Sequence, residues 1–279
     1  MAESQVPGNT TLASDLYGDG VRIGIYLQVL GMLLCCIRHK QSGIKLASSS
    51  TILALLAAWS VRISKEDLSP VEAWIVLAII GLIWVPTIAA LVAPTNMVGE
   101  GVATTALAVA LIWHTFAMIA FWSTLFKSLP QLGTQNMMFF LGRVNIKGRV
   151  SEFMVAVGGG QIFILAPSLI IFLIMIRRGT KAWLRGEKEL DIESLHQEKR
   201  WMKKSQQRVV AYLGVLGLLG WTVGIIAVEL MIRWNGLVPV KDLSQPGQLV
   251  PFVTGIIICT DAFVGLLQPP WNVRGSRGE

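Results

Sequence analysis

Three ionisable side chains stand deep inside long apolar runs of this sequence, namely His114, Glu229 and Asp261. A charged group at the centre of a bilayer costs roughly 2.5 to 3.5 kcal/mol, so such residues usually face a protein interior and mark a functional site. Carboxyl and imidazole groups can donate and accept protons in such a site. We therefore predict a polar site within the membrane, with these three residues as its candidate catalytic groups.

Each of the three also has a structural interpretation. Glu229 can pair with Arg233 at i+4 on the same helix. Asp261 shares one helical face with Thr254, and it can form a hydrogen bond to a neighbouring helix there. His114 can be a packed, hydrogen-bonded residue. The sequence leaves these alternatives open.

A second set of polar residues accompanies the first apolar run. Asp19, Arg22 and Tyr26 are spaced i, i+3 and i+7, so they form one stripe along a helix. This stripe is either a helix cap with an arginine that reaches the interface or the ion-paired wall of a substrate pocket. Glu72 opens the third run on the same predicted side, which makes one cavity shared by all these groups geometrically possible.

Aromatic residues within the runs are candidates for the lining of such a cavity. The chain has 10 tryptophans, and the faces of aromatic rings attract cations. Trp113, Phe121, Trp122 and Trp221 are the candidates, with packing between helices as the alternative interpretation.

The apolar runs define the class of protein that must position these residues. Hydrophobic residues make up 53% of the chain and charged residues 15%, with a mean hydropathy of +0.59, whereas a soluble domain carries roughly 25% charged residues. Each of seven runs is long enough to cross a bilayer. These runs are 21–37, 46–63, 71–93, 102–126, 153–176, 209–233 and 250–268. We predict an all-α, seven-helix transmembrane bundle over residues 21–268.

Basic residues set the predicted orientation. The loop after the first run carries Arg38, Lys40 and Lys45, and the segment 177–208 carries ten basic against five acidic residues. Both should face the cytoplasm by the positive-inside rule. Residues 1–20 are then extracytoplasmic, with a glycosylation sequon at Asn9, and residues 269–279 form a cytoplasmic tail.

Two connecting segments fit this scheme less simply. The stretch 127–149 is basic although it lies on the extracytoplasmic side, and we expect it to lie on the membrane with residues 137–141 partly buried. The segment 180–207 alternates charged and apolar residues, which is typical of an amphipathic helix at the membrane surface or of a solvated linker helix.

Several chemistries are disfavoured by missing motifs. The sequence has no aspartate-rich motif for magnesium diphosphate, no phosphate-binding loop, no His-Glu-x-x-His and no Gly-x-Ser-x-Gly. It also has no nucleic-acid motif, and its basic residues indicate contact with membrane lipid instead. We expect no metal and no nucleotide cofactor.

Residues 15–28 read Asp-Leu-Tyr-Gly-Asp-Gly-Val-Arg-Ile-Gly-Ile-Tyr-Leu-Gln, and this N-terminal motif resembles the start of a large group of fungal multi-span membrane proteins. Within that group, the length and the seven runs resemble the small membrane-bound terpene cyclases of fungal meroterpenoid pathways, the ascofuranone and macrophorin type. The resemblance implies an enzyme of the endoplasmic reticulum membrane that protonates an epoxide or terminal alkene of a lipid-like prenylated aromatic.

On this hypothesis Asp261 is the first candidate for the proton donor and Glu229 the second. His114 would orient the acid or accept the final proton, because a cyclisation ends with proton loss. A proton-coupled transporter or channel would need the same residue types within the membrane. A receptor-like membrane protein without catalysis is the third alternative.

Overall fold

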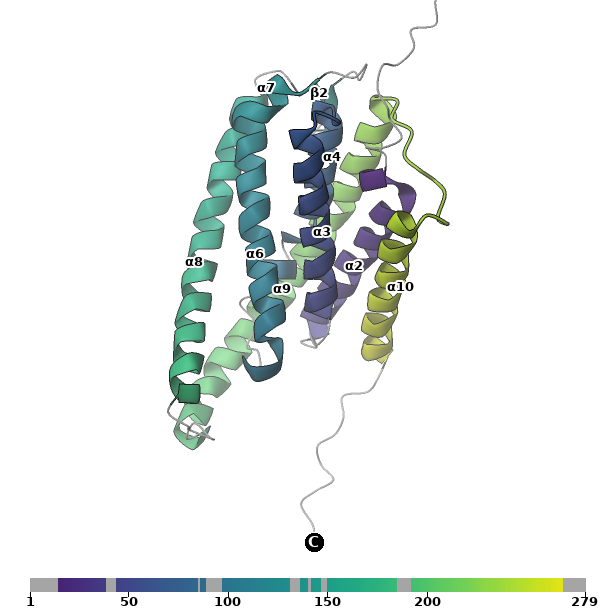
Figure 1. Cartoon of the computed structure of the whole chain (residues 1–279). Helices are drawn as coiled ribbons and strands as arrows, with labels where there is room; N and C mark the ends of the chain where they lie inside the picture. Colours follow the sequence, from purple (N-terminus) through teal and green to yellow (C-terminus); the bar gives the residue numbers. More distant parts are fainter. Residues whose placement is uncertain are drawn as a thin grey trace, which may run out of the picture.

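The computed structural model describes residues 15–38, 44–84, 86–88, 97–130, 136–139, 142–146, 150–184 and 192–267. Within these ranges the chain forms a bundle of long helices that run alternately in opposite directions (Figure 1). The helical elements are η1 (Asp15–Tyr17), α2 (Asp19–Arg38), α3 (Ile44–Ser64), α4 (Pro70–Gly81), α6 (Met97–Ala120), η2 (Phe121–Leu125), α7 (Phe126–Ser128), α8 (Val150–Leu184), α9 (Ile192–Trp234) and α10 (Pro246–Leu267). Strands β1 (Met137–Phe139) and β2 (Arg143–Asn145) lie between α7 and α8.

Five helices of the described chain are long and apolar enough to cross a membrane. Their apolar stretches are Asp15–Cys36, Pro70–Ile88, Thr105–Ser128, Tyr212–Trp234 and Pro246–Leu267. The chain is therefore a mostly helical, membrane-embedded protein, as its composition predicted. The other two predicted runs correspond to α3, whose first turns contain several hydroxyl residues, and to α8, where Val150–Phe163 forms a shorter apolar stretch.

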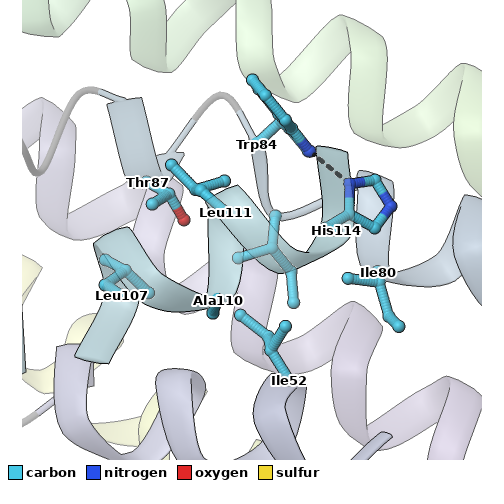
Figure 2. A pocket seen from close by; sticks show the side chains of 9 residues that line it. Ile52, Ile80, Trp84, Thr87, Leu107, Ala110, Leu111 and His114 are labelled. Carbon is cyan, nitrogen blue, oxygen red and sulfur yellow. Dashed lines mark hydrogen bonds between the residues drawn. The ribbon is translucent and has the colours of Figure 1, made fainter. Parts of the chain in front are cut away.

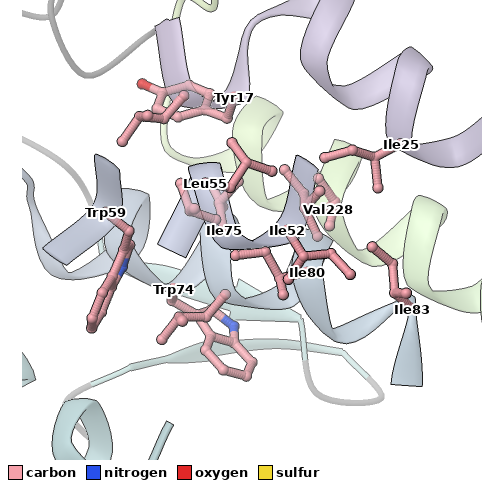
Figure 3. Packing of buried hydrophobic residues seen from close by; sticks show 14 of the residues in the cluster. Tyr17, Ile25, Ile52, Leu55, Trp59, Trp74, Ile75, Ile80, Ile83 and Val228 are labelled. Atoms are coloured by element: carbon pink, nitrogen blue, oxygen red, sulfur yellow. The ribbon is translucent and has the colours of Figure 1, made fainter. Parts of the chain in front are cut away.

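Apolar side chains of four helices meet in the core of the bundle (Figure 3). Ile25 of α2, Leu56 of α3, Ile75 of α4 and Val228 of α9 are all fully buried. The indole Nε1 of Trp59 on α3 donates a hydrogen bond to a backbone carbonyl of α4 at 3.0 Å. Segments distant in sequence thus share one apolar interior, which fixes α2 and α9 on the same side of α4.

The closest packing in the bundle is between α2 and α10, and glycine makes it possible. A methyl group at Gly24 would overlap the carbonyl of Pro251, and one at Gly20 would overlap the backbone of Gln248. Gly255 of α10 meets the backbone of Gly24 in the same way. Small residues allow membrane helices to approach until their backbones touch. The glycines of the N-terminal motif therefore form a helix-packing surface.

Gln248 fixes the register of this helix pair. Its side chain is fully buried against Gly18 and Gly20. Its Oε1 accepts a hydrogen bond from the backbone N–H of Val21 at 3.2 Å, and its Nε2 donates to the carbonyl of Asp15 at 2.8 Å. The first N–H groups of a helix have no partner within the helix, so α10 caps α2 with this side chain.

Helix α4 is interrupted within its membrane-crossing stretch. Regular helix ends at Gly81, and the backbone N–H groups at positions 82 and 83 donate to carbonyls three residues back, at 3.2 and 3.1 Å. The helical pattern resumes where the N–H of Thr87 donates to the carbonyl of Ile83 at 3.0 Å. Pro86 has no N–H and cannot continue the regular ladder. The sequence predicted a membrane-crossing run over 71–93, and the structure places this interruption within it.

The described part of the segment 127–149 contains the β1–β2 hairpin, which contacts the end of α9. Met138 is buried and Met137 and Phe139 are half-buried, which agrees with the partial burial expected of this stretch. Asn235 holds β1 by accepting from the backbone N–H of Met137 at 2.9 Å and donating to its carbonyl at 2.7 Å. Phe139 stacks on Trp234 with ring centroids 6.1 Å apart. The hairpin forms because its backbone groups then have partners.

The segment 180–207 is not a separate surface helix where the structure describes it. Helix α8 continues to Leu184 and α9 begins at Ile192, so the described residues of this segment belong to the ends of two long helices, and residues 185–191 lie outside the described ranges. Residues 1–14 and 268–279, to which the predicted orientation assigns opposite sides, lie outside the described residues.

We predict that the substitution Gly24→Ala lowers the stability of the protein by about 1–3 kcal/mol, because an added methyl group forces α2 and α10 apart. To measure this change, the purified protein is heated in detergent and its unfolding is monitored by size-exclusion chromatography. Gly220→Ala on α9 is the matched control, since no atom lies within 4 Å of the added group and alanine is the better helix former. Equal loss in both variants would contradict the packing role of Gly24.

Candidate functional site

A buried arginine stands at the centre of a polar cluster between α2 and α9. Arg22 Nη2 donates to Asp19 Oδ1 at 2.6 Å, and Arg22 Nε lies 3.2 Å from Glu229 Oε1. The hydroxyl of Tyr26 donates to the same oxygen of Glu229 at 3.1 Å. The side chain of Arg22 is 7% exposed and that of Glu229 is 44% exposed. The structure thus brings four of the predicted residues together, and we call them the Arg22 cluster.

The helical period positions the Arg22 cluster opposite the glycine surface of α2. Residues 22 and 26 are one turn apart and point toward α9, while Gly20 and Gly24 point toward α10. Trp221, two turns before Glu229 on α9, donates from its indole Nε1 to the carbonyl of Tyr26 at 3.0 Å. Trp221 therefore also belongs to this contact between helices, as a positioning residue.

Several polar atoms of the Arg22 cluster remain available for a ligand. Arg22 Nε and Nη1 are buried and have no hydrogen-bond partner within the described ranges, although Nε lies 3.2 Å from Glu229 Oε1 as an ion pair. Both contacts to Glu229 use Oε1, and among the described residues none uses Oε2. Among the described residues, Glu229 pairs with Arg22 across two helices and not with Arg233 on its own helix. The cluster can therefore donate and accept hydrogen bonds, and Glu229 can exchange a proton.

Glu72 has a structural task apart from the Arg22 cluster. Its Oε1 accepts from the hydroxyl of Tyr17 at 2.7 Å, and its Oε2 accepts from the backbone N–H and the hydroxyl of Ser69 at 2.9 and 2.7 Å. Ser69 and Glu72 form the reciprocal capping box that starts α4. Both carboxylate oxygens are occupied, so Glu72 docks η1 onto α4.

His114 joins α6 to the break in α4. The indole Nε1 of Trp84 donates to His114 Nδ1 at 2.7 Å, and His114 Nε2 lies 2.9 Å from the carbonyl of Leu77. An indole can only donate, and a carbonyl can only accept, so we assign the imidazole proton to Nε2. Both nitrogens of this buried ring are engaged, which matches the structural interpretation of His114.

A small cavity lies beside His114 (Figure 2). Aliphatic side chains of α3, α4 and α6 line most of it, and Thr87 contributes a buried hydroxyl that has no partner in the part of the chain that the structure describes. The space open to a water-sized sphere is about 10 Å³. That is room for one water molecule, whereas a pocket for an organic ligand has roughly 300–1,000 Å³.

The predicted aromatic residues form a packed group and not the wall of this cavity. The π-helical turn η2 turns Phe121 and Trp122 into the core, where their ring centroids lie 6.2 and 4.9 Å from that of Trp74. Phe121 and Trp122 also contact each other edge to face at 5.0 Å. Trp113 is 37% exposed and lies outside the group.

Asp261 forms no hydrogen bond or ion pair with another ionisable residue in the described part of the chain. It is exposed on α10, whose buried face consists of Gln248, Gly255, Ile258, Cys259 and Ala262. The structure thus joins Glu229 to the Arg22 cluster, while Glu72 and His114 have separate partners and Asp261 is outside these contacts. The small residues of α10 decide which face packs against α2, and Asp261 does not belong to that face.

Sequence reasoning missed one residue of the N-terminal motif as a candidate. Gln28 is fully buried on α2, and both atoms of its amide lack a hydrogen-bond partner among the residues that the structure describes. A buried amide without partners is costly. The signal was present in the sequence, because Gln28 is a polar residue in the middle of an apolar run.

The fold and the Arg22 cluster define a helical, membrane-embedded protein with an ion-paired polar site at one end of its bundle. Comparisons with protein-family models, with curated proteins and with solved structures find no match to the chain. Its function must therefore be argued from the Arg22 cluster itself.

We predict that Arg22→Gln lowers stability by about 1–3 kcal/mol, because the carboxylates of Asp19 and Glu229 lose their common partner. The loss in the double variant Arg22→Gln/Glu229→Gln should be smaller than the sum of the two single losses. Arg62→Gln is the control, since the Arg62–Asp67 pair is partly exposed and such pairs contribute about 0–1 kcal/mol. Thermal unfolding in detergent measures all four, and strictly additive losses would show that Arg22 and Glu229 do not interact.

Proposed function

We propose that this chain is an integral membrane terpene cyclase that starts the cyclisation of a prenylated aromatic by protonation at Glu229. The observation that carries the proposal is the geometry of that carboxyl group. Arg22 and Tyr26 contact one of its oxygens, and among the described residues the other oxygen has no partner, on a side chain that is 44% exposed. The likeness of residues 15–28 to the start of fungal membrane-bound cyclases agrees with this assignment.

The proposal includes seven membrane crossings, with an extracytoplasmic N-terminus and a cytoplasmic C-terminus, in the endoplasmic reticulum membrane. The alternating direction of the long helices α2, α3, α4, α6, α8, α9 and α10 supports an odd number of crossings. The Arg22 cluster then lies near the extracytoplasmic surface. Glu229 stands five residues before the end of α9, which is about 8 Å along a helix.

The reaction is an isomerisation in which every atom and electron is retained. A proton passes from Glu229 Oε2 to the epoxide oxygen, the C–O bond opens, and the electron pair of a neighbouring alkene forms the new C–C bond. With a terminal alkene as substrate, the proton goes to carbon instead. Loss of a proton from the last cation to the Glu229 carboxylate ends the reaction. No oxidant or reductant is needed.

The neighbours of Glu229 have distinct roles in this proposal. Arg22 and Tyr26 would stabilise the carboxylate that remains after the proton has left, because Tyr26 donates a hydrogen bond to Oε1 and Arg22 places its positive charge 3.2 Å from the same oxygen. Asp19 would hold the guanidinium group in place through its contact with Nη2. The ring of Trp221 would offer an aromatic face to the cation.

The substrate would approach from the lipid, where a prenyl chain dissolves. The outer face of α9 next to the Arg22 cluster is apolar, with Val223 54% and Ile226 48% exposed. A prenyl chain dissolved in the bilayer can lie along this face and place its reactive end at Glu229. This route requires no enclosed pocket in the unliganded protein.

The test is incubation of microsomes that contain the protein with a farnesylated phenol and with its terminal epoxide, followed by mass spectrometry. We expect a product of unchanged mass and shifted retention. Glu229→Gln should lower the rate by about 10²-fold or more, which is the usual contribution of a general acid. Glu152→Gln, an exposed carboxyl at the start of α8, is the matched control and should retain activity.

Asp261→Asn separates the two candidate acids. We expect it to retain activity, since Asp261 is exposed and does not belong to the face of α10 that packs against α2. Activity lost in Asp261→Asn and kept in Glu229→Gln would move the acid to Asp261. Absence of any isomer, with protein that elutes as a folded species, would contradict the cyclase proposal.

One observation favours the alternative of proton-coupled transport. The interrupted α4 resembles the broken helices that line ion and substrate sites in transporters, and His114 accepts a hydrogen bond from Trp84 within that interruption. Proteoliposomes with an internal pH-sensitive dye would test this alternative. Proton uptake that disappears in His114→Gln, and that persists in Glu229→Gln, would favour transport over cyclisation.

A further inference from the structure

Asp261 places a carboxyl group on the outer side of α10 within an apolar stretch. It stands fifteen residues after Pro246 and six before Leu267, so about 9 Å of helix separates it from the nearer end. Ile257 and Val264, one turn away on either side, are 62% and 48% exposed. The carboxyl group therefore lies where the lipid chains would be, and an ionisable group there almost always has a partner.

The bundle itself cannot supply this partner. Helix α10 contacts the rest of the protein chiefly through α2, on the face that carries Gly255 and Ile258. A rotation that brought Asp261 inward would break the backbone contact between Gly255 and Gly24 and the hydrogen bonds of Gln248. Within the described ranges, no hydrogen bond or ion pair of Asp261 is formed. The close packing of α10 against α2 therefore keeps the face that carries Asp261 turned away from the bundle.

We propose that this face of α10 binds a transmembrane helix of a second, different protein that carries a lysine or arginine at the depth of Asp261. A lysine or arginine paired with Asp261 offsets the free-energy cost of placing both charges in lipid, because opposite charges attract strongly at a low dielectric constant. Thr260, exposed next to Asp261, offers a hydroxyl group to the same partner. The proposal is independent of the cyclase activity.

Five stretches of this chain are long and apolar enough to cross a membrane, and their basic residues are Arg22, Lys127 and Arg233. Arg22 is buried and paired, while Lys127 and Arg233 lie in the last turns of α7 and α9, at the end of the bundle where α10 begins. In a second copy with the same membrane orientation, these five stretches therefore bring no basic residue to the level of Asp261, and two facing carboxylates repel each other.

The test uses the full chain in lipid nanodiscs, labelled with an acceptor fluorophore. The probes are donor-labelled polyleucine transmembrane peptides with one lysine, placed at three depths one helical turn apart, and the same peptide without lysine. We expect energy transfer with at least one lysine peptide and none with the plain peptide. Asp261→Asn should weaken this binding about tenfold or more, whereas Asp261→Glu should preserve it. Asp242→Asn, in the exposed loop before α10, is the control for loss of any carboxylate.

Both Asp261 variants should elute and unfold like the unsubstituted protein, because the side chain is exposed. Equal binding of the lysine and plain peptides, or binding at none of the three depths, would overturn the proposal. So would association between two copies of the chain that is lost in Asp261→Asn, because the occupant would then be the chain itself.

Discussion

The contact between the backbones of α2 and α10 determines the arrangement of the polar groups in this protein. Lipid offers no hydrogen bonds and little difference in hydrophobicity, so helices within it are held by close packing. Gly20, Gly24 and Gly255 permit that packing, and Gln248 adds the hydrogen bonds that fix its register. Once α10 occupies one side of α2, the opposite side, with Arg22 and Tyr26, is left for α9.

The N-terminal motif therefore has two physical tasks on one helix. Its glycines make the backbone contact, and its arginine and tyrosine make the polar contact with Glu229. The two tasks use different faces because four-residue spacing returns to the same side of a helix. Tyr17, just before α2, adds a third contact by bonding Glu72 at the start of α4. A segment of fourteen residues thus anchors α2 to three other helices.

Sequence reasoning reached the membrane class and the stripe of Asp19, Arg22 and Tyr26, because composition and helical spacing are local properties. It could not choose between a cap and an ion-paired cluster, since the choice depends on Glu229, which lies 203 positions from Tyr26. Helical periodicity placed Asp261 and Thr254 on a common face of their helix, but it could not tell whether that face points into the bundle or away from it. Pro86 is visible in the sequence and indicates an interruption of α4. The hydrogen bond of His114 to the carbonyl of Leu77 on α4 could be seen only in the structure.

The length of helix α9 exceeds what is needed to cross a membrane. Its 43 residues extend about 65 Å, while the hydrocarbon layer is about 30 Å thick. The stretch of α9 that can cross a membrane is Tyr212–Trp234, so the twenty residues before it extend the helix by about 30 Å, alongside the end of α8 (Figure 1). A soluble protein bound to the first turns of α9 would be held at a distance from the membrane-crossing stretch that the length of this helix sets.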